Sequence, residues 1–163
     1  MMQKAKINGL ALDVTTNSPV VILAPESDQE TRILPIWIGH YEAWAIAMEL
    51  SGVASKRPLT HDLIRSCIEH LGGKVEKVEV TELVNQTFYA KMYIQLNGKT
   101  IEVDARPSDS IAIALKTSAP IFVNEELFQM KRSDGITQDL SDPESLKDRL
   151  RKIPPEEFGK YSL

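Results

Sequence analysis

The clearest alternation of apolar and polar side chains lies in the second half of the chain. Residues 88–96 place an apolar side chain at every second position, which is typical of a β-strand with one buried face. Asn97 and Gly98 follow, and this pair favours a two-residue hairpin turn with positive φ at both positions. Such a turn sets the register of the next strand, so we expect Lys91 opposite Asp104 and Tyr89 opposite Arg106. This register puts Asp104 and Arg106 together on the outward face at the end of the strand.

The first half of the chain repeats this arrangement in outline. Residues 34–48 match residues 101–115 in character, and Glu42 then aligns with Asp109. Each copy is expected to be a strand that ends in a tight junction, followed by a helix with an acidic residue in its first turn. Two further strand candidates precede each junction. The pattern therefore predicts an α+β fold of antiparallel three-stranded units, each followed by a helix, approximately duplicated and completed by a C-terminal helix.

A separate helix is expected between the two halves, with Thr60 as its N-cap. Its apolar side chains recur at helical spacing: Leu63, Ile64, Cys67, Ile68 and Leu71. Because the single cysteine, Cys67, lies within this stripe, we expect it to be buried among apolar side chains rather than to act as a nucleophile.

One domain is expected over residues 1–130, followed by a charged tail over residues 131–163. In the tail, Ser141 and Glu144 have the spacing of a capping box with an apolar stripe behind it, which predicts one docking helix. No apolar stretch is long enough to cross a bilayer, and the first residues lack the pattern of a secretory signal. We therefore expect a cytoplasmic protein without membrane contact.

Composition and motifs limit the classes of function. The 19 basic and 23 acidic residues give a formal net charge of −4, so nucleic acid could bind only through a local basic patch. The sequence contains no P-loop, no Gly-x-Ser-x-Gly elbow, no Cys-x-x-Cys pair and no His-Glu-x-x-His motif. These absences disfavour P-loop nucleotide hydrolysis, serine hydrolysis and structural zinc.

The junction at residues 104–109 is the first candidate site. Asp104, Arg106 and Asp109 lie where a strand ends and a helix begins, a place where backbone N–H groups attract anions. Two nearby carboxylates suit Mg²⁺ or Mn²⁺, and an arginine binds phosphate through parallel hydrogen bonds, so the stretch fits metal-assisted phosphodiester cleavage. The alternative is structural, with Asp104 paired to Lys91 and Asp109 complementing the helix dipole.

The basic loop before the central helix is the second candidate. Lys56 and Arg57 lead into His61 and Asp62 at the start of the helix. The His61 imidazole could serve as a general base or a metal ligand. Adjacent helical residues point in different directions, so His61 and Asp62 need not converge on one atom. A histidine on a solvated surface is the alternative.

Residues 111–115 are apolar on all sides, which is typical of a helix buried on both faces. In so small a domain a second subunit could supply the second covering surface. We therefore expect a homo-oligomer, most simply a two-fold dimer, joined through this helix. The alternative is burial between the domain's own sheet and its C-terminal helix.

Several of these stretches together resemble the bifunctional nuclease domain family. The resemblance extends over residues 5–130. It rests on motifs at residues 34–39 with 42–43, 57–63, 87–90 and 104–112. Ser110 is a small departure, because the family usually has alanine at that position. The resemblance implies a nuclease that degrades DNA, RNA or both.

The first functional hypothesis is a divalent-metal-dependent nuclease that uses Mg²⁺ or Mn²⁺. The candidate metal ligands are the carboxylates Glu42, Asp104 and Asp109. The candidate catalytic residues are His61, as the base, with Asp62, Asp104 and Asp109. The candidate phosphate-binding residues are Lys56, Arg57 and Arg106.

The alternative hypothesis is a non-catalytic homo-oligomer that binds a small anion or a protein partner at the same junctions. The surroundings of Asp104 and Asp109 discriminate between the two. Carboxylate oxygens close enough to share one ion favour the enzyme. Saturation of these oxygens by Lys91 and backbone donors favours the binding protein.

Overall fold

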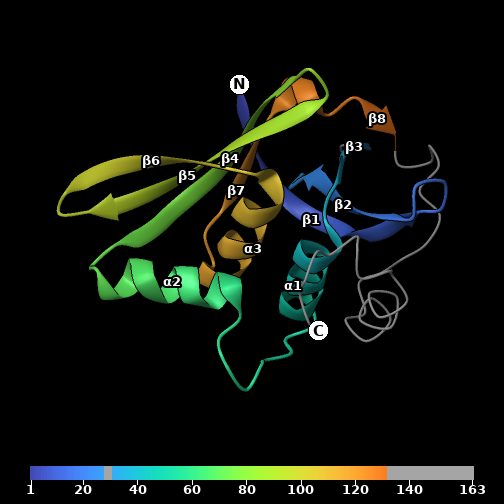
Figure 1. Ribbon diagram of the computed structural model, residues 1–163. Helices are drawn as coiled ribbons and strands as arrows, with labels where there is room; N and C mark the ends of the chain where they lie inside the picture. Colours follow the sequence, from blue (N-terminus) through green and yellow to red (C-terminus); the bar gives the residue numbers. More distant parts are fainter. Residues whose placement is uncertain (28–30, 132–163) are drawn as a thin grey trace.

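Helices α1 and α3 each follow three antiparallel strands in the computed structural model, which describes residues 1–27 and 31–131 (Figure 1). The first group comprises β1 (Met2–Asp13), β2 (Ser18–Pro25), β3 (Arg32–Trp37) and α1 (His40–Leu50). The second comprises β4 (Lys74–Val84), β5 (Thr87–Leu96), β6 (Lys99–Ala105) and α3 (Pro107–Thr117). The remaining elements are α2 (Thr60–His70) between the groups, then β7 (Ile121–Asn124), a 3-10 turn (Glu125–Leu127) and β8 (Met130–Lys131). The predicted α+β fold class is confirmed.

The strands form a mixed sheet in the order β6-β5-β4-β7-β1-β2-β3-β8. At its centre β7 runs antiparallel to β1 and parallel to β4. The sequence predicted antiparallel strands alone and no strand after the helix that is now α3. The parallel pairing of β7 with β4 corrects both predictions. Because β6 and β7 run in the same direction, α3 is the helix of a crossover connection that returns the chain from the edge of the sheet to its centre. The approximate duplication stays a prediction.

Helix α3 lies in the middle of the core. The three helices lie on one side of the sheet, with α3 between α1 and α2 (Figure 1). The side chains of Ile111, Ala112, Ile113 and Ala114 are buried within the single chain. The predicted dimer contact through this helix is therefore wrong, because the sheet and the other two helices already cover its apolar surface. Self-association itself stays a prediction.

The β5–β6 hairpin has the predicted turn and register. Asn97 and Gly98 adopt φ angles of 52° and 75°. Lys91 faces Asp104 across the two strands, and the pairing continues to the end of β6 at Ala105. The turn and the alternation of side chains were thus sufficient to place the junction that follows.

Cys67 is exposed, so its predicted burial is wrong. Helix α2 packs mainly against α3 and meets the sheet at β4, which leaves part of its apolar stripe uncovered. Ile64 and Ile68 pack against the core, whereas Leu63 is exposed. Thr60 is the first helical residue rather than the N-cap, a position that Leu59 occupies.

The predicted docking helix of the tail lies outside the described residues. The domain boundary after residue 130 stays a prediction, and β8 extends the sheet next to β3 up to Lys131. None of the helices in the described ranges has the length and apolar composition that a membrane span requires. The cytoplasmic location also stays a prediction.

Replacing Gly98 by alanine tests the hairpin turn. Apart from Gly98 and its two neighbours in the chain, no described residue has an atom within 4 Å of the position that a Cβ would occupy, so the change adds no packing contact. The positive φ of 75° is unfavourable for a residue with a Cβ, and we expect the free energy of unfolding to fall by about 1 kcal/mol. Urea unfolding measures this fall. The control Lys99→Ala, at an exposed neighbouring position, should change stability by less than about 0.5 kcal/mol, and equal stability of both variants would contradict the prediction.

Candidate functional site

Arg106 links the first turns of helices α1 and α3. It is the N-cap residue of α3, directly after β6. Its Nε donates a hydrogen bond to Asp109 Oδ2 at 2.9 Å, and its Nη2 donates one to Glu42 Oε1 at 2.6 Å. The other carboxylate oxygen of Asp109 lies 2.9 Å from Nε2 of His61, on α2. We call Glu42, His61, Arg106 and Asp109 the Arg106 cluster.

The way in which the two helices begin positions these side chains. Pro107 takes the first position of α3, where its missing N–H costs no hydrogen bond, so the helix starts directly after Arg106. Glu42 and Asp109 lie in the first turns of their helices, where the helix dipole favours negative charge. Gly39 is the N-cap of α1, and a Cβ there would overlap the Glu42 carboxylate. The glycine thus leaves the space from which Glu42 reaches Arg106.

Exposure within the cluster increases from the histidine to the arginine. The side chains are 4% exposed for His61, 15% for Glu42, 28% for Asp109 and 65% for Arg106. The hydrogen bond with His61, supported by the one from Arg106, holds the pKa of Asp109 below its ordinary value against the effect of burial. The contact with Asp109 in turn raises the pKa of Arg106. The cluster therefore presents a permanent cation to solvent, backed by ionised Asp109.

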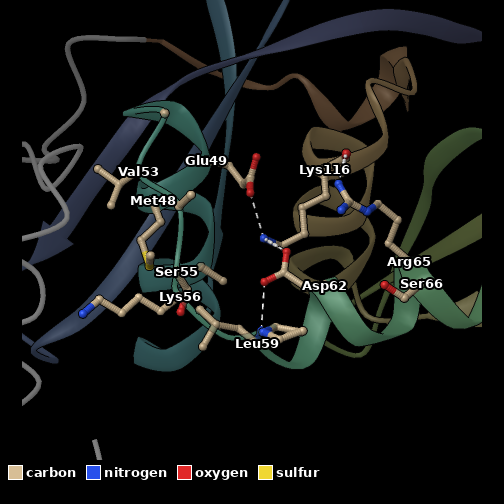
Figure 2. A pocket seen from close by; sticks show the side chains of 14 residues that line it. Met48, Glu49, Val53, Ser55, Lys56, Leu59, Asp62, Arg65, Ser66 and Lys116 are labelled. Carbon is tan, nitrogen blue, oxygen red and sulfur yellow. Dashed lines mark hydrogen bonds and ion pairs between the residues drawn. The ribbon is translucent and has the colours of Figure 1, made fainter.

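A second cluster lies at the other end of α3 (Figure 2). Lys116 Nζ is 2.7 Å from Glu49 Oε1 of α1 and 2.7 Å from Asp62 Oδ1 of α2. The second carboxylate oxygen of Asp62 accepts a hydrogen bond from the Leu59 backbone N–H at 2.9 Å, at the start of α2. Arg65 Nη1 donates to the Lys116 carbonyl at 3.2 Å. We call Glu49, Asp62 and Lys116 the Lys116 cluster.

The Lys116 cluster is held together by charge. The Lys116 side chain is 5% exposed. Burial acts to lower the pKa of Lys116, but its hydrogen bonds to Asp62 and Glu49 outweigh burial and raise it. Burial likewise acts to raise the pKa of Asp62, but the hydrogen bonds from Lys116 and Leu59 lower it. Lys116 and Asp62 are therefore both charged at neutral pH, and the cluster ties the three helices together.

Each cluster borders a cavity. A cavity of about 430 Å³ lies beside the Lys116 cluster, and Lys56 lines it (Figure 2). Arg57 is exposed in the same loop. A cavity of about 320 Å³ lies beside the Arg106 cluster and is lined by Trp37, Phe88 and Arg106. The basic residues that were predicted to hold phosphate are thus divided, because Lys56 and Arg106 border different cavities.

Comparison with known proteins gives a family for this chain. The family model described as the bifunctional nuclease domain matches residues 21–134. The chain belongs to this bifunctional nuclease domain family. An uncharacterized protein of Mycobacterium tuberculosis is 38% identical over 96% of this chain and 98% of its own length. Two plant proteins named bifunctional nuclease 1 are also similar: the Arabidopsis thaliana protein is 29% identical over 72% of this chain, and the Oryza sativa subsp. japonica protein 28% over 65%.

The plant relatives are much longer than the region that they share with this chain. The matched region covers 36% of the Arabidopsis protein and 33% of the rice protein. Their names describe nucleases, and the family model carries the same description. The resemblance that the sequence motifs indicated is thereby confirmed.

The structure brings together four of the predicted site residues: Glu42, His61, Arg106 and Asp109. His61 is buried, so the alternative of a histidine on a solvated surface is wrong. Asp62 follows His61 directly but turns to Lys116, as expected for adjacent positions on a helix.

Asp104 lies apart from this group. It is exposed on β6, and the contacts between described residues do not join it to Asp109. Lys91, its partner in the strand register, forms an ion pair with Glu102 at 3.2 Å. Within residues 1–27 and 31–131, no group of three or more His, Cys, Asp or Glu side chains is placed to hold a metal ion.

Two residues of the Lys116 cluster, Glu49 and Lys116, were missed in the sequence. Glu49 and Lys116, which bind one another, are 67 positions apart. The same offset aligns Glu42 with Asp109, so extending the internal match by one position would have aligned this second pair as well. Gly39 lies in one of the motifs that carry the family resemblance, but its role depends on how closely the Glu42 side chain approaches it in the folded helix start.

Acid should weaken the Lys116 cluster through Asp62. A carboxyl group whose pKa is lower in the folded chain than its ordinary value of 3.8 stabilises the fold above that value, and this stabilisation is lost as the pH falls through the folded pKa. We therefore expect Asp62→Asn to be less stable than the original chain near pH 7, with the difference shrinking below about pH 4. Urea unfolding at both pH values measures it. Glu82→Gln, at an exposed position, is the control, and a pH-independent effect of Asp62→Asn would count against this account.

Gly39→Ala should disturb the Arg106 cluster while leaving the fold nearly intact. The φ of −71° at Gly39 suits alanine, but the new Cβ would displace the Glu42 carboxylate from its position near Arg106. We expect a loss of less than about 1 kcal/mol in stability. A double-mutant cycle with Glu42→Gln should show a coupling of about 0.5 kcal/mol or more between positions 39 and 42. Additive effects would show that Gly39 does not make room for Glu42.

Proposed function

We propose that this bifunctional nuclease domain hydrolyses phosphodiester bonds of DNA, RNA or both at the Arg106 cluster. The observation that carries the proposal is the exposed Arg106 guanidinium bound to Asp109, whose other oxygen contacts the buried His61. The family and the names of the plant relatives support a nuclease. The sequence and the cluster together therefore favour phosphodiester chemistry over other hydrolytic reactions.

Arg106 supplies phosphate binding and charge stabilisation in this proposal. A guanidinium carries several N–H donors, and the contacts with Glu42 and Asp109 engage only Nε and Nη2. The remaining donors belong to a side chain that is mostly exposed and can form parallel hydrogen bonds with a phosphate. Negative charge grows on the phosphoryl oxygens as the ester bond breaks. A cation that is already held in place stabilises this charge without further reorganisation.

Asp109 and His61 have different roles in the proposed hydrolysis because their side chains differ in exposure. Asp109 is the outer of the two groups, so its carboxylate would orient the attacking water, while His61 behind it keeps the carboxylate in place. The water oxygen joins the phosphorus and gives its proton to the Asp109–His61 pair. The leaving oxygen keeps the electron pair of the broken P–O bond and takes a proton from solvent. The role of His61 as a base, predicted from the sequence, is thus refined to a proton-sharing partner of Asp109.

The proposal also includes a requirement of the cleavage reaction for Mg²⁺ or Mn²⁺. Carboxylate oxygens are suitable ligands for both ions, and Glu42 and Asp109 lie together at Arg106. Both carboxylates already bind the guanidinium, so they do not fit an ion in this arrangement unless Arg106 is released. Loss of cleavage on adding a chelator would therefore indicate two things: that an ion is required, and that Arg106 moves away from Glu42 and Asp109 to admit it.

Anion binding without chemistry is the second candidate function. Both oxygens of Asp109 have a partner, an arrangement that also suits a side chain whose task is to hold Arg106. These partners are His61 and Arg106, rather than the Lys91 and backbone donors that the sequence-based criterion named. A homo-oligomer of this kind would bind phosphate or an acidic partner at Arg106 and release it unchanged.

Asp109→Asn tests the proposed activity. The change keeps the shape of the side chain but removes its charge, so we expect stability to fall by no more than about 1 kcal/mol. Cleavage of single-stranded and duplex DNA and RNA should fall by about two orders of magnitude or more, because the proton acceptor is lost. Glu102→Gln, an exposed carboxylate of β6, is the matched control and should cleave at the original rate.

Three results of this experiment are informative. Cleavage that survives in Asp109→Asn at the original rate would remove Asp109 from the mechanism. Phosphate binding without cleavage by the original chain, with or without added Mg²⁺ or Mn²⁺, would favour the anion-binding oligomer. Cleavage abolished by EDTA and restored by one of these ions would establish the metal-dependent form.

A further inference from the structure

We infer that the cavity beside Arg106 is a subsite for an unpaired nucleobase, which stacks on Trp37 while Arg106 holds the adjoining phosphate. The substrate class is then single-stranded nucleic acid. The inference rests on the proposed function, and it adds a residue, Trp37, that the proposed chemistry does not use. The cavity of about 320 Å³ lies at the lower end of the range for small-ligand sites.

Trp37 has the properties of a stacking surface. It is the last residue of β3, and it is 48% exposed although it is among the largest apolar side chains of the chain. Its Nε1 donates a hydrogen bond to Asp13 Oδ2 at 2.8 Å, which satisfies the polar atom of the indole and holds the ring at the cavity wall. Phe88 lines the same cavity as a second aromatic residue. Bases of every kind stack on such rings, because each base has a π-face.

Groups that attract anions converge on the same cavity. Arg106 lines it, and so do Gly39 and Ser108 at the starts of α1 and α3. No side-chain hydrogen bond caps the start of either helix. Both helices have 11 residues, so their dipoles place partial positive charge at the cavity. A nucleotide stacked on Trp37 would therefore meet Arg106 and two helix N-termini in one cavity.

The larger cavity lacks this combination. The residues that line it include no aromatic side chain, and of its two lysines, Lys56 and Lys116, the latter is already paired with Glu49 and Asp62 (Figure 2). Stacking on a protein ring also selects the state of the nucleic acid. In a duplex both faces of a base are covered by its neighbours, whereas a single strand can turn a base outward. The combination of Trp37 with Arg106 thus points to an unpaired strand.

The test measures how the full chain binds fluorescently labelled oligonucleotides with phosphorothioate linkages, which slow cleavage. We expect Trp37→Leu to bind the single strand about tenfold more weakly or worse, because a stacked base is lost. Binding of a duplex of the same length, which uses phosphate contacts only, should change less than about twofold. Leu71→Ala, at another exposed apolar position, is the matched control. Trp37→Phe keeps a ring and should recover part of the affinity.

The outcomes separate the subsite from the proposed function. Equal single-strand affinity of Trp37→Leu and the original chain overturns the subsite, and cleavage by the original chain then still supports the nuclease. Binding that depends on Trp37 without any cleavage supports the subsite and overturns the nuclease. The absence of both binding and cleavage overturns both. If Trp37→Leu does not fold, Trp37→Met removes the ring with a more flexible side chain, and the same comparison applies to it.

Discussion

The burial of helix α3 between the sheet, α1 and α2 is the constraint on which the rest of the structure depends. The middle of this helix is apolar and inaccessible, so its charged side chains lie near its ends: Asp109 in the first turn and Lys116 in the last. A buried or half-buried charge is costly unless a partner is present. Both residues therefore contact α1 and α2, directly or through Arg106, and the two clusters add directional contacts to apolar packing that has no direction of its own.

Features with a local cause could be predicted from the sequence, and those that depend on packing could not. The Asn97–Gly98 turn determines the register of β5 and β6, because its backbone geometry leaves one pairing of the two strands. The four residues of β7 have no comparable signal, since their place in the sheet depends on where α3 returns the chain. Cys67 was misjudged for a related reason. Periodicity shows which residues share a face of α2, but the neighbouring elements decide how much of that face they cover.

The candidate site shows the same division. Residue chemistry was enough to nominate Arg106, Asp109 and His61. The contacts that join three helices, His61 with Asp109 and Arg106 with Glu42, are long-range and could not be seen in the sequence. Asp104 was assigned to the same site because strand alternation was carried beyond the end of β6. The strand ends at Ala105, and Arg106 is already an N-cap whose side chain turns to α1, so Asp104 and Arg106 do not continue one face. The register of a strand thus predicts the direction of side chains only as far as the strand itself continues.

The charge of the Arg106 cluster affects how a nucleic acid could be held there. One guanidinium faces two carboxylates, so Glu42, Arg106 and Asp109 together carry a net negative charge when both acids are ionised. The carboxylates fix the arginine in place, but they also repel the phosphate that it would bind. With a net charge of −4 over the chain, general electrostatic attraction does not offset this repulsion. Affinity at this site must therefore depend on hydrogen bonds aimed by the fixed guanidinium, on the helix N-termini and on stacking, and it should fall less steeply with salt than that of a basic groove.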